Sequence, residues 1–294
     1  MTIYRNITIY QELLSKRPPG LLLMLLSRSN PCSIYHNYKI RIHNMFKRNL
    51  VILVGIMALL LAGGSQALAG KKIINGIDAN FPPFAFIDQK GVPSGFDVDA
   101  MNWIAKEMGY EVEHKPFDWD GIITSLLTKK IDMVASGMSI TPDRMEKVSF
   151  TNPYWKIKQV MVVKKDSTLT LDDLLKGKKM VGVQQGTSEA KWLKETAEKN
   201  GWNLELRYYD SSPLAVEDIL NGRIAAAAMD DAPAKDATEK KDVKILGTFG
   251  MEPEDFGYAI RKEDTQLLKD INEGLKRLMA SDYWKELIKK YDLK

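Results

Sequence analysis

Residues 136–144 read SGMSITPDR and place a loop rich in polar groups between a strand and a helix. A short apolar strand is predicted to end at Gly137, and a helix to begin with Thr141 as its N-cap and Pro142 at its first position. Arg144 then lies one turn into that helix. The loop offers free backbone groups, hydroxyls and a planar guanidinium, which binds a carboxylate through two hydrogen bonds. The same residues also fit an ordinary capped helix with a solvated arginine.

Strand-like and helix-like segments alternate on both sides of this stretch, which predicts an α/β fold. The first group has predicted strands at 72–78, 110–116 and 131–136, and predicted helices at 96–108 and 119–129. The second has predicted strands at 159–164, 179–184, 204–209, 224–229 and 243–246, and predicted helices at 188–200 and 213–221. A strand at 256–261 and helices at 265–279 and 283–290 follow. Two α/β units joined by extended segments near 155–160 and 250–257 predict a cleft between them, a favoured place for a small ligand.

Two further loops place polar groups at predicted strand ends. Residues 184–188, QQGTS, open a helix whose N-terminal amides would attract an anion, although a routine strand-to-helix turn fits equally well. Asp230 follows a strand of small residues, and a carboxylate at such a tip would pair with an ammonium group. We expect its neighbour Asp231 to cap the next helix.

A third cluster joins an acid to aromatic side chains. Asp78 ends the first predicted strand, and Phe81 and Trp119 lie in the loops DANFPPF (78–84) and DWDG (118–121). A carboxylate beside aromatic rings suits a cationic or amide-bearing group. Packing into the core is the default for aromatic residues.

Together these loops resemble a known family. The order of Asp78, FPPF (81–84), GFDVD (95–99), SGMSIT (136–141) with Arg144, FTNPY (150–154), GV…GTS (182–188) and Asp230 is similar to that of the polar amino-acid binding proteins of ABC importers. The resemblance spans residues 72–292. It implies an α/β, two-lobed periplasmic binding protein (type II) fold with two crossover strands and a ligand cleft between lobes. Lobe 1 would comprise 70–155 plus 253–294, and lobe 2 would comprise 156–252.

The resemblance also implies a role for each matched position. Arg144 and the amides near Ser188 would hold a ligand carboxylate, while Asp230, Ser139 and the Gly137 carbonyl would hold an ammonium group. The full implied set of ligand-binding residues is Asp78, Phe81, Trp119, Gly137, Ser139, Arg144, Gln184, Thr187, Ser188, Met229 and Asp230. Within it, Asp78, Phe81 and Trp119 would line the side-chain pocket, and Gln184 and Met229 would add shape.

The distribution of charge separates the first 69 residues from the rest. The chain has 42 Lys+Arg against 38 Asp+Glu, but residues 1–69 hold eight basic side chains and one acidic side chain, so residues 70–294 carry a net charge of −3. The basic excess is therefore not evidence of nucleic-acid binding. The basic pair at 47–48, the apolar run at 50–62 and the ALA triplet at 67–69 predict a signal peptide over 45–69, cleaved after Ala69. A retained membrane anchor is the alternative, but 13 residues fall short of the ~20 that span a bilayer.

Two features of this segment bear on the mature protein. We expect Met45 to be the true start and residues 1–44 to be an upstream extension, with a real cytoplasmic tail as the alternative. The single cysteine, Cys32, lies there, so no disulfide, thiolate metal site or cysteine nucleophile is expected after Ala69. Glycines at 63–64 stand where a lipoprotein signal needs cysteine, which favours a protein free in the periplasm.

The signal-peptide pattern and the resemblance together imply a periplasmic, monomeric protein that binds a free L-amino acid and delivers it to an ABC importer permease. Asp78 beside two aromatics favours a cationic ligand of the arginine or lysine type, with glutamine or another polar neutral amino acid as the near rival. No metal, cofactor or nucleic acid is expected. The alternatives are a sensor domain and a cleft enzyme similar to cyclohexadienyl dehydratase, which would need a general acid. His114, expected at the surface of a strand, is not placed to serve as that acid.

Overall fold

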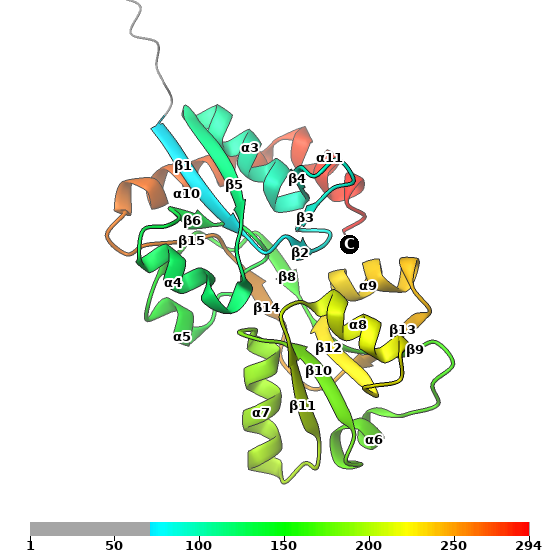
Figure 1. The fold of residues 1–294 in the computed structure, drawn as a ribbon. Coiled ribbons are helices and arrows are strands. Elements are labelled where there is room, and N and C mark those ends of the chain that lie inside the picture. The colour runs from blue at the N-terminus through cyan, green and yellow to red at the C-terminus, as the bar shows by residue number, and fades with distance from the viewer. Residues whose placement is uncertain (1–70, 294) are drawn as a thin grey trace, which may run out of the picture. The chain divides into compact units, whose positions relative to one another are not determined.

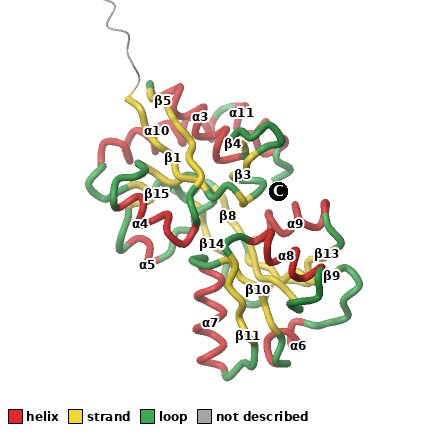
Figure 2. The backbone as a smooth tube through the Cα atoms, in the orientation of Figure 1, coloured by secondary structure: helices red, strands yellow, loops and turns green. Residues whose placement is uncertain are grey.

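Two five-stranded sheets flanked by helices make up residues 71–293, the part of the chain that the computed structural model describes (Figures 1 and 2). These residues belong to one unit, Leu68–Lys294. The predicted signal peptide at 45–69, its cleavage after Ala69 and the predicted extension at 1–44 lie outside the described residues. Within 71–293, none of the helices is both long enough and apolar enough to cross a bilayer.

The first sheet has the strand order β5-β1-β6-β15-β7. Its strands are β1 (Lys71–Ile77), β5 (Tyr110–Pro116), β6 (Met133–Val134), β7 (Ser149–Phe150) and β15 (Ala259–Ile260). Both β5 and β6 pair with β1 in parallel. Successive side chains of a strand point to opposite faces. Ile73 therefore packs in the cluster formed with α3 (Phe96–Met108), α10 (Thr265–Ala280) and α11 (Asp282–Lys290), whereas Ile74 packs in the cluster formed with α4 (Ile122–Leu127).

The second sheet has the order β11-β10-β12-β9-β13. Its strands are β9 (Gln159–Lys164), β10 (Met180–Gln184), β11 (Glu205–Tyr209), β12 (Ala226–Asp230) and β13 (Val243–Thr248). Along β12, Ala226 and Ala228 face the cluster that includes side chains of α6 (Leu171–Lys176) and α7 (Ser188–Asn200), while Ala227 and Met229 face side chains of α8 (Ser212–Leu220) and α9 (Asp231–Lys240). Burial on both faces explains why residues 226–229 of this strand are all apolar.

Two short strands carry the chain between the sheets. β8 (Trp155–Ile157) leads from the first sheet to the second, β14 (Glu254–Phe256) leads back, and the two pair in antiparallel fashion. A three-stranded sheet of β2 (Asn80–Phe81), β3 (Ala85–Ile87) and β4 (Pro93–Ser94) precedes α3. The remaining elements are the 3-10 turn η1 (Trp119–Gly121) and α5 (Pro142–Met145). The predicted α/β class is confirmed.

Several predicted elements are shorter or divided. The strand predicted at 131–136 is reduced to β6, and the helix predicted at 119–129 is η1 followed by α4. The strand predicted at 256–261 is divided because the N–H groups of Gly257 and Tyr258 bond to Met138 and to the Thr151 hydroxyl. Asp231 is not the N-cap as predicted: it is the first residue of α9. α6 was not predicted, and α9 was expected only as the helix that Asp231 would cap, without bounds.

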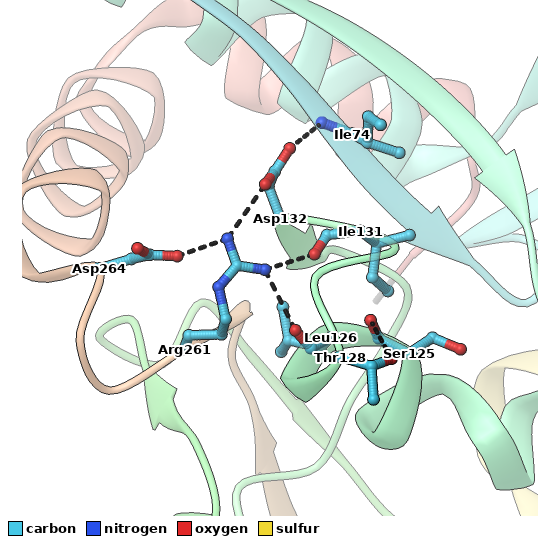
Figure 3. Close-up of polar contacts among 8 residues, drawn as sticks. All are labelled: Ile74, Ser125, Leu126, Thr128, Ile131, Asp132, Arg261 and Asp264. Carbon is cyan, nitrogen blue, oxygen red and sulfur yellow. Dashed lines mark hydrogen bonds and ion pairs between the residues drawn. The ribbon is translucent and has the colours of Figure 1, made fainter.

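A buried arginine connects the pieces around β6 (Figure 3). Arg261 is 6 % exposed, and its Nη1 donates to the carbonyls of Leu126, at the end of α4, and Ile131. Its Nη2 forms ion pairs with Asp132 at 3.0 Å and Asp264 at 2.6 Å. The other oxygen of Asp132 accepts from the Ile74 N–H in β1. Side-chain hydrogen bonds and ion pairs therefore replace, at this point, the backbone hydrogen bonds that a longer β6 would have made.

A second polar group is buried between β1, β5 and α3. Asn75 Oδ1 accepts from the Ala135 N–H at 2.7 Å, so Asn75 Nδ2 is the donor to the His114 Nδ1 at 3.0 Å. Because His114 Nδ1 accepts, its Nε2 carries the proton and donates to Asn102 Oδ1 at 3.1 Å. His114 is half-buried rather than at the surface as predicted. Burial lowers the pKa of His114 to about 4, against the opposing charge of Asp99.

This geometry predicts that His114 destabilises the fold in acid. The unfolded chain binds the proton near pH 6.5 and the folded chain only near pH 4, so the stability associated with His114 falls as the pH drops through that window and is constant below it. We expect a loss of up to about 3 kcal/mol in the free energy of unfolding. Buried carboxyls titrate with the opposite sign, so urea denaturation of wild type and His114→Gln is compared at each pH. Equal pH dependence in the two proteins would contradict this assignment.

Candidate functional site

A small cavity lies where loops of both sheets meet, and its empty space of about 280 Å³ is partly open to solvent. Its lining comprises Asp78, Phe81, Trp119, Ser136, Gly137, Ser139, Arg144, Gln184, Thr187, Ser188, Glu189 and Asp230. All the residues singled out from the sequence are among them except Met229. Met229 is 1 % exposed and packs against α8 and α9, because adjacent residues of β12 point to opposite faces.

Arg144 joins loops of the two sheets across this cavity. Thr141 caps α5, as predicted, and the Arg144 side chain is only 9 % exposed. Its Nη1 donates to the Ser139 carbonyl at 2.9 Å, and its Nη2 donates to the Gly186 carbonyl at 3.1 Å. The guanidinium lies 5.5 Å from the centre of the Trp119 ring, within cation–π range. Burial lowers the pKa of Arg144, while the surrounding carboxylates oppose that shift.

The loop that carries Gly137 is held in place by a buried carboxylate. Asp97, fully buried in α3, accepts from the Gly137 N–H at 2.6 Å, the Tyr154 hydroxyl at 2.8 Å and the Tyr258 hydroxyl at 3.3 Å. Burial raises the pKa of Asp97 to about 7, and these three hydrogen bonds act in the opposite direction. Asp97 therefore fixes the loop without lining the cavity.

Asp78 forms the second link across the cavity. It is 4 % exposed, and its carboxylate accepts from Gln184 Nε2 at 2.7 Å and from the Asn80 N–H at 3.0 Å. Its own N–H donates to the Ser136 hydroxyl at 2.9 Å, and the Ser212 hydroxyl donates to Gln184 Oε1. Burial raises the pKa of Asp78. Asp78 and Gln184, predicted separately, are therefore direct partners.

Asp230 and Ser188 each form a hydrogen bond with a neighbouring side chain, and the partner of Ser188 is a further acid, Glu254. Gln159 Nε2 donates to Asp230 Oδ1 at 2.8 Å, and the Ser188 hydroxyl donates to Glu254 Oε2 at 2.6 Å. Burial, followed by the charge of Glu189, raises the pKa of Asp230. Asp230 makes no capping hydrogen bond to α9, so its carboxylate is left to face the cavity.

Ser136 and Glu189 were not identified as site residues from the sequence. Glu189 is 4 % exposed, in the first turn of α7 beside Ser188, and burial raises its pKa to about 7. Thr187 caps the same helix by accepting from the Ala190 N–H. An acid in a first helical turn is usually a solvated partner of the helix dipole. The position of Glu189 directly after the GTS turn was the one sequence signal that pointed to it.

The arrangement has the chemistry of a small, charged binding site. One guanidinium and three carboxylic side chains line it, and the Trp119 indole N–H is buried with no hydrogen-bond partner among the described residues. In the described part of the chain, acids and histidines nowhere gather in a group suited to a metal ion. Such a cavity can hold a small ligand that carries both signs of charge.

Comparison with known proteins places the chain in a family. The model of the bacterial extracellular solute-binding proteins, family 3, matches residues 73–294. The chain belongs to this family. It is 31% identical over 254 residues to the L-cystine-binding protein TcyJ of Escherichia coli K12, covering 81% of this chain and 94% of TcyJ. The resemblance drawn from the sequence motifs is therefore confirmed.

Solved structures of the family agree with the observed fold. A mutant of ArgBP from T. maritima matches with a TM-score of 0.69 at 37% identity, covering 76% of this chain and 96% of that one. The ancestral amino acid-binding protein AncCDT-1, a precursor of cyclohexadienyl dehydratase, matches with a TM-score of 0.69 at 35% identity, covering 75% of this chain and 95% of that one. The two-lobed periplasmic binding protein fold is the fold of this chain.

Gly137 is predicted to be indispensable to the shape of the cavity. Its φ is +58°, and a Cβ added there would lie 2.4 Å from the Phe81 ring. We expect Gly137→Ala to lower the free energy of unfolding by about 1–3 kcal/mol, measured by urea denaturation. The control is Gly121→Ala, where nothing lies within 4 Å of the added methyl group. Equal stability of the two variants would contradict the steric argument.

Proposed function

We propose that this protein binds a free L-amino acid in the cavity and delivers it to the permease of an ABC importer. One observation carries the proposal: a buried guanidinium and buried carboxylates converge on one small cavity. Family membership supports the same function.

We assign each polar group of the ligand to the protein groups that would bind it. The α-carboxylate pairs with Arg144 and the amides near Ser188, and two hydrogen bonds to backbone carbonyls leave three of the five guanidinium donors for it. The ammonium group pairs with Asp230, Ser139 and the Gly137 carbonyl. The ligand side chain lies against Asp78, Phe81, Trp119 and Gln184, where the indole N–H is also available as a donor.

The charge of the cavity favours a cationic ligand. Asp78, Glu189 and Asp230 outnumber Arg144, so an arginine- or lysine-type side chain is attracted, and an acidic amino acid is disfavoured. Glutamine or another polar neutral amino acid is the near rival, because Asp78 already accepts from the amide of Gln184 and would accept from a ligand amide in the same way.

Ligand binding is coupled to closure of two lobes. We propose lobe 1 at 70–155 plus 253–294 and lobe 2 at 156–252, with β8 and β14 as the crossovers. Arg144 and Asp78 then belong to lobe 1, and Ser188, Gln184 and Asp230 to lobe 2. A ligand held by both sets favours the closed form through contacts that the open form lacks.

We further propose that the protein is exported and works as a monomer. Cleavage of the signal peptide after Ala69 would release it into the periplasm, as expected of this extracellular family. No enzymatic activity is needed for the proposed role.

A dehydratase is the second candidate because the cavity contains a buried carboxylic acid. Glu189, whose pKa is raised to about 7, has the properties of the general acid that such a reaction on a cyclic substrate needs. The ancestral relative AncCDT-1 is itself a binding protein. Turnover of prephenate or arogenate by the purified protein would favour the enzyme, and its absence favours the transporter component.

Amino acids of the preferred class are expected to stabilise the protein. Ligand at about 100 times its Kd adds about 2.7 kcal/mol, which corresponds to roughly 5–10 °C in Tm for a chain of this size. A thermal-shift screen of the common L-amino acids, plus cystine, measures this. We expect the largest shifts with arginine or lysine, then glutamine, and none with aspartate or glutamate. A screen without any shift would refute amino-acid binding.

Removing either opposed charge is expected to abolish micromolar binding. Arg144→Ala or Asp230→Ala leaves one charged group of the ligand buried without a partner, at a cost of about 3–5 kcal/mol, or roughly 10²–10³-fold or more in Kd. Isothermal titration calorimetry measures Kd for wild type and both variants. Arg277→Ala and Asp166→Ala, at exposed positions, are the matched controls. Near wild-type affinity in Arg144→Ala would refute the assigned carboxylate site.

A further inference from the structure

One acid of the cavity has no counter-charge when the ligand is placed as proposed. A cationic amino acid brings two positive groups and one negative group. The α-carboxylate pairs with Arg144, the ammonium group pairs with Asp230, and the cationic side chain pairs with Asp78. Glu189 then remains, nine-tenths buried, on the lining of the same cavity. A polar neutral ligand leaves the cavity still more negative.

The surroundings of Glu189 increase this excess of negative charge. The charges of Glu254 from β14 and Asp230 from β12 both act on it. Hydrogen bonds with its own N–H and with Thr187 oppose them, and so does the charge of Arg144 from α5. Lys191, two residues further along α7, is already paired with Asp143 and Glu195. A buried carboxylate without a counter-charge ordinarily becomes protonated rather than remain charged.

We infer that Glu189 takes up a proton when the ligand binds and the lobes close, and that its hydroxyl then donates a hydrogen bond to the ligand's α-carboxylate. This inference rests on the proposed function. Glu189 follows Ser188, whose amide region is assigned to that carboxylate, and it interacts with Arg144, the other assigned partner. An ionised Glu189 would repel the ligand carboxylate there, whereas a protonated one adds a donor.

The raised pKa of Glu189, about 7 in this closed arrangement, supports the direction of the effect. In an open form the carboxyl meets water and titrates near its ordinary value of about 4.3. Between these values the closed, liganded form binds more protons than the open form. Affinity should therefore rise as the pH falls from about 7 to about 5, by roughly tenfold or more.

The test is calorimetric titration of the mature chain with L-arginine, which does not change charge between about pH 5 and pH 7. Near pH 6.5, titrations in phosphate and in Bis-Tris, whose ionisation enthalpies differ, give the number of protons taken up. We expect about half a proton or more per ligand for wild type and markedly less for Glu189→Gln, which mimics the protonated acid. Glu198→Gln, exposed on the same helix, should match wild type.

The affinities measured across the pH range provide a second readout. Glu189→Gln should bind L-arginine within a few-fold of wild type near pH 5, with a flatter dependence of Kd on pH. Asp78, Asp97 and Asp230 also titrate, but they are shared by all three proteins, so the difference between proteins reports Glu189.

The outcomes separate this inference from the proposed function. If wild type binds L-arginine without proton uptake, or Glu189→Gln takes up as many protons as wild type, the inference is overturned and amino-acid binding stands. If Glu189→Gln loses most of its affinity at pH 5 while still folded, Glu189 acts as an ionised partner of the ligand's cation, which also overturns it. If neither L-arginine, L-lysine nor L-glutamine binds wild type, the proposed function falls. If Glu189→Gln does not fold, Glu189→Met, which also lacks a carboxyl group, replaces it in the same comparison with wild type.

Discussion

The site depends on a buried arginine whose hydrogen bonds run to loops of both sheets. Arg144 donates to the Ser139 carbonyl on one side and the Gly186 carbonyl on the other. A charge removed from water must be compensated by fixed dipoles and counter-charges, and here these come from two separate parts of the fold. The Asp78–Gln184 hydrogen bond makes a second link of the same kind. The cavity therefore exists only while both halves are together.

Two buried polar clusters, one around Asp97 and one around Arg261, fix the geometry of loops in the first half of the fold. Asp97 receives three hydrogen bonds from Gly137, Tyr154 and Tyr258, and Arg261 ties the end of α4 to β6 and the start of α10 (Figure 3). Buried polar groups are costly when unpaired, so a network in which most members are satisfied selects one arrangement of the surrounding loops. A bound molecule would then meet a loop that is already ordered, which lowers the entropic cost of binding.

The sequence predicted the long elements well and the short ones poorly. Helices at 96–108 and 188–200 and strands at 110–116 and 159–164 agree with the structure in both limits. Each helix contains several turns of apolar residues, and the strand at 159–164 is a continuous apolar run. β6 has only two residues, and its extent depends on the side chain of Asp132, directly before it, and on that of Arg261, which is 129 residues from Asp132. The order of the motifs in the sequence identified nearly all of the residues that line the cavity. It missed Glu189, because burial of an acid in a first helical turn is decided by tertiary packing.

The balance of charge in the cavity links selectivity to protonation. A cavity with more acids than cations can be neutralised in two ways, by a cationic ligand or by protons. An acidic amino acid supplies neither and adds a further buried negative charge, which in a poorly solvated cavity is strongly repelled. In the proposed arrangement a cationic amino acid pairs with Asp78 and Asp230 but not with Glu189, because its own carboxylate pairs with Arg144. The same excess of acid that selects the ligand therefore obliges the closed complex to hold a proton.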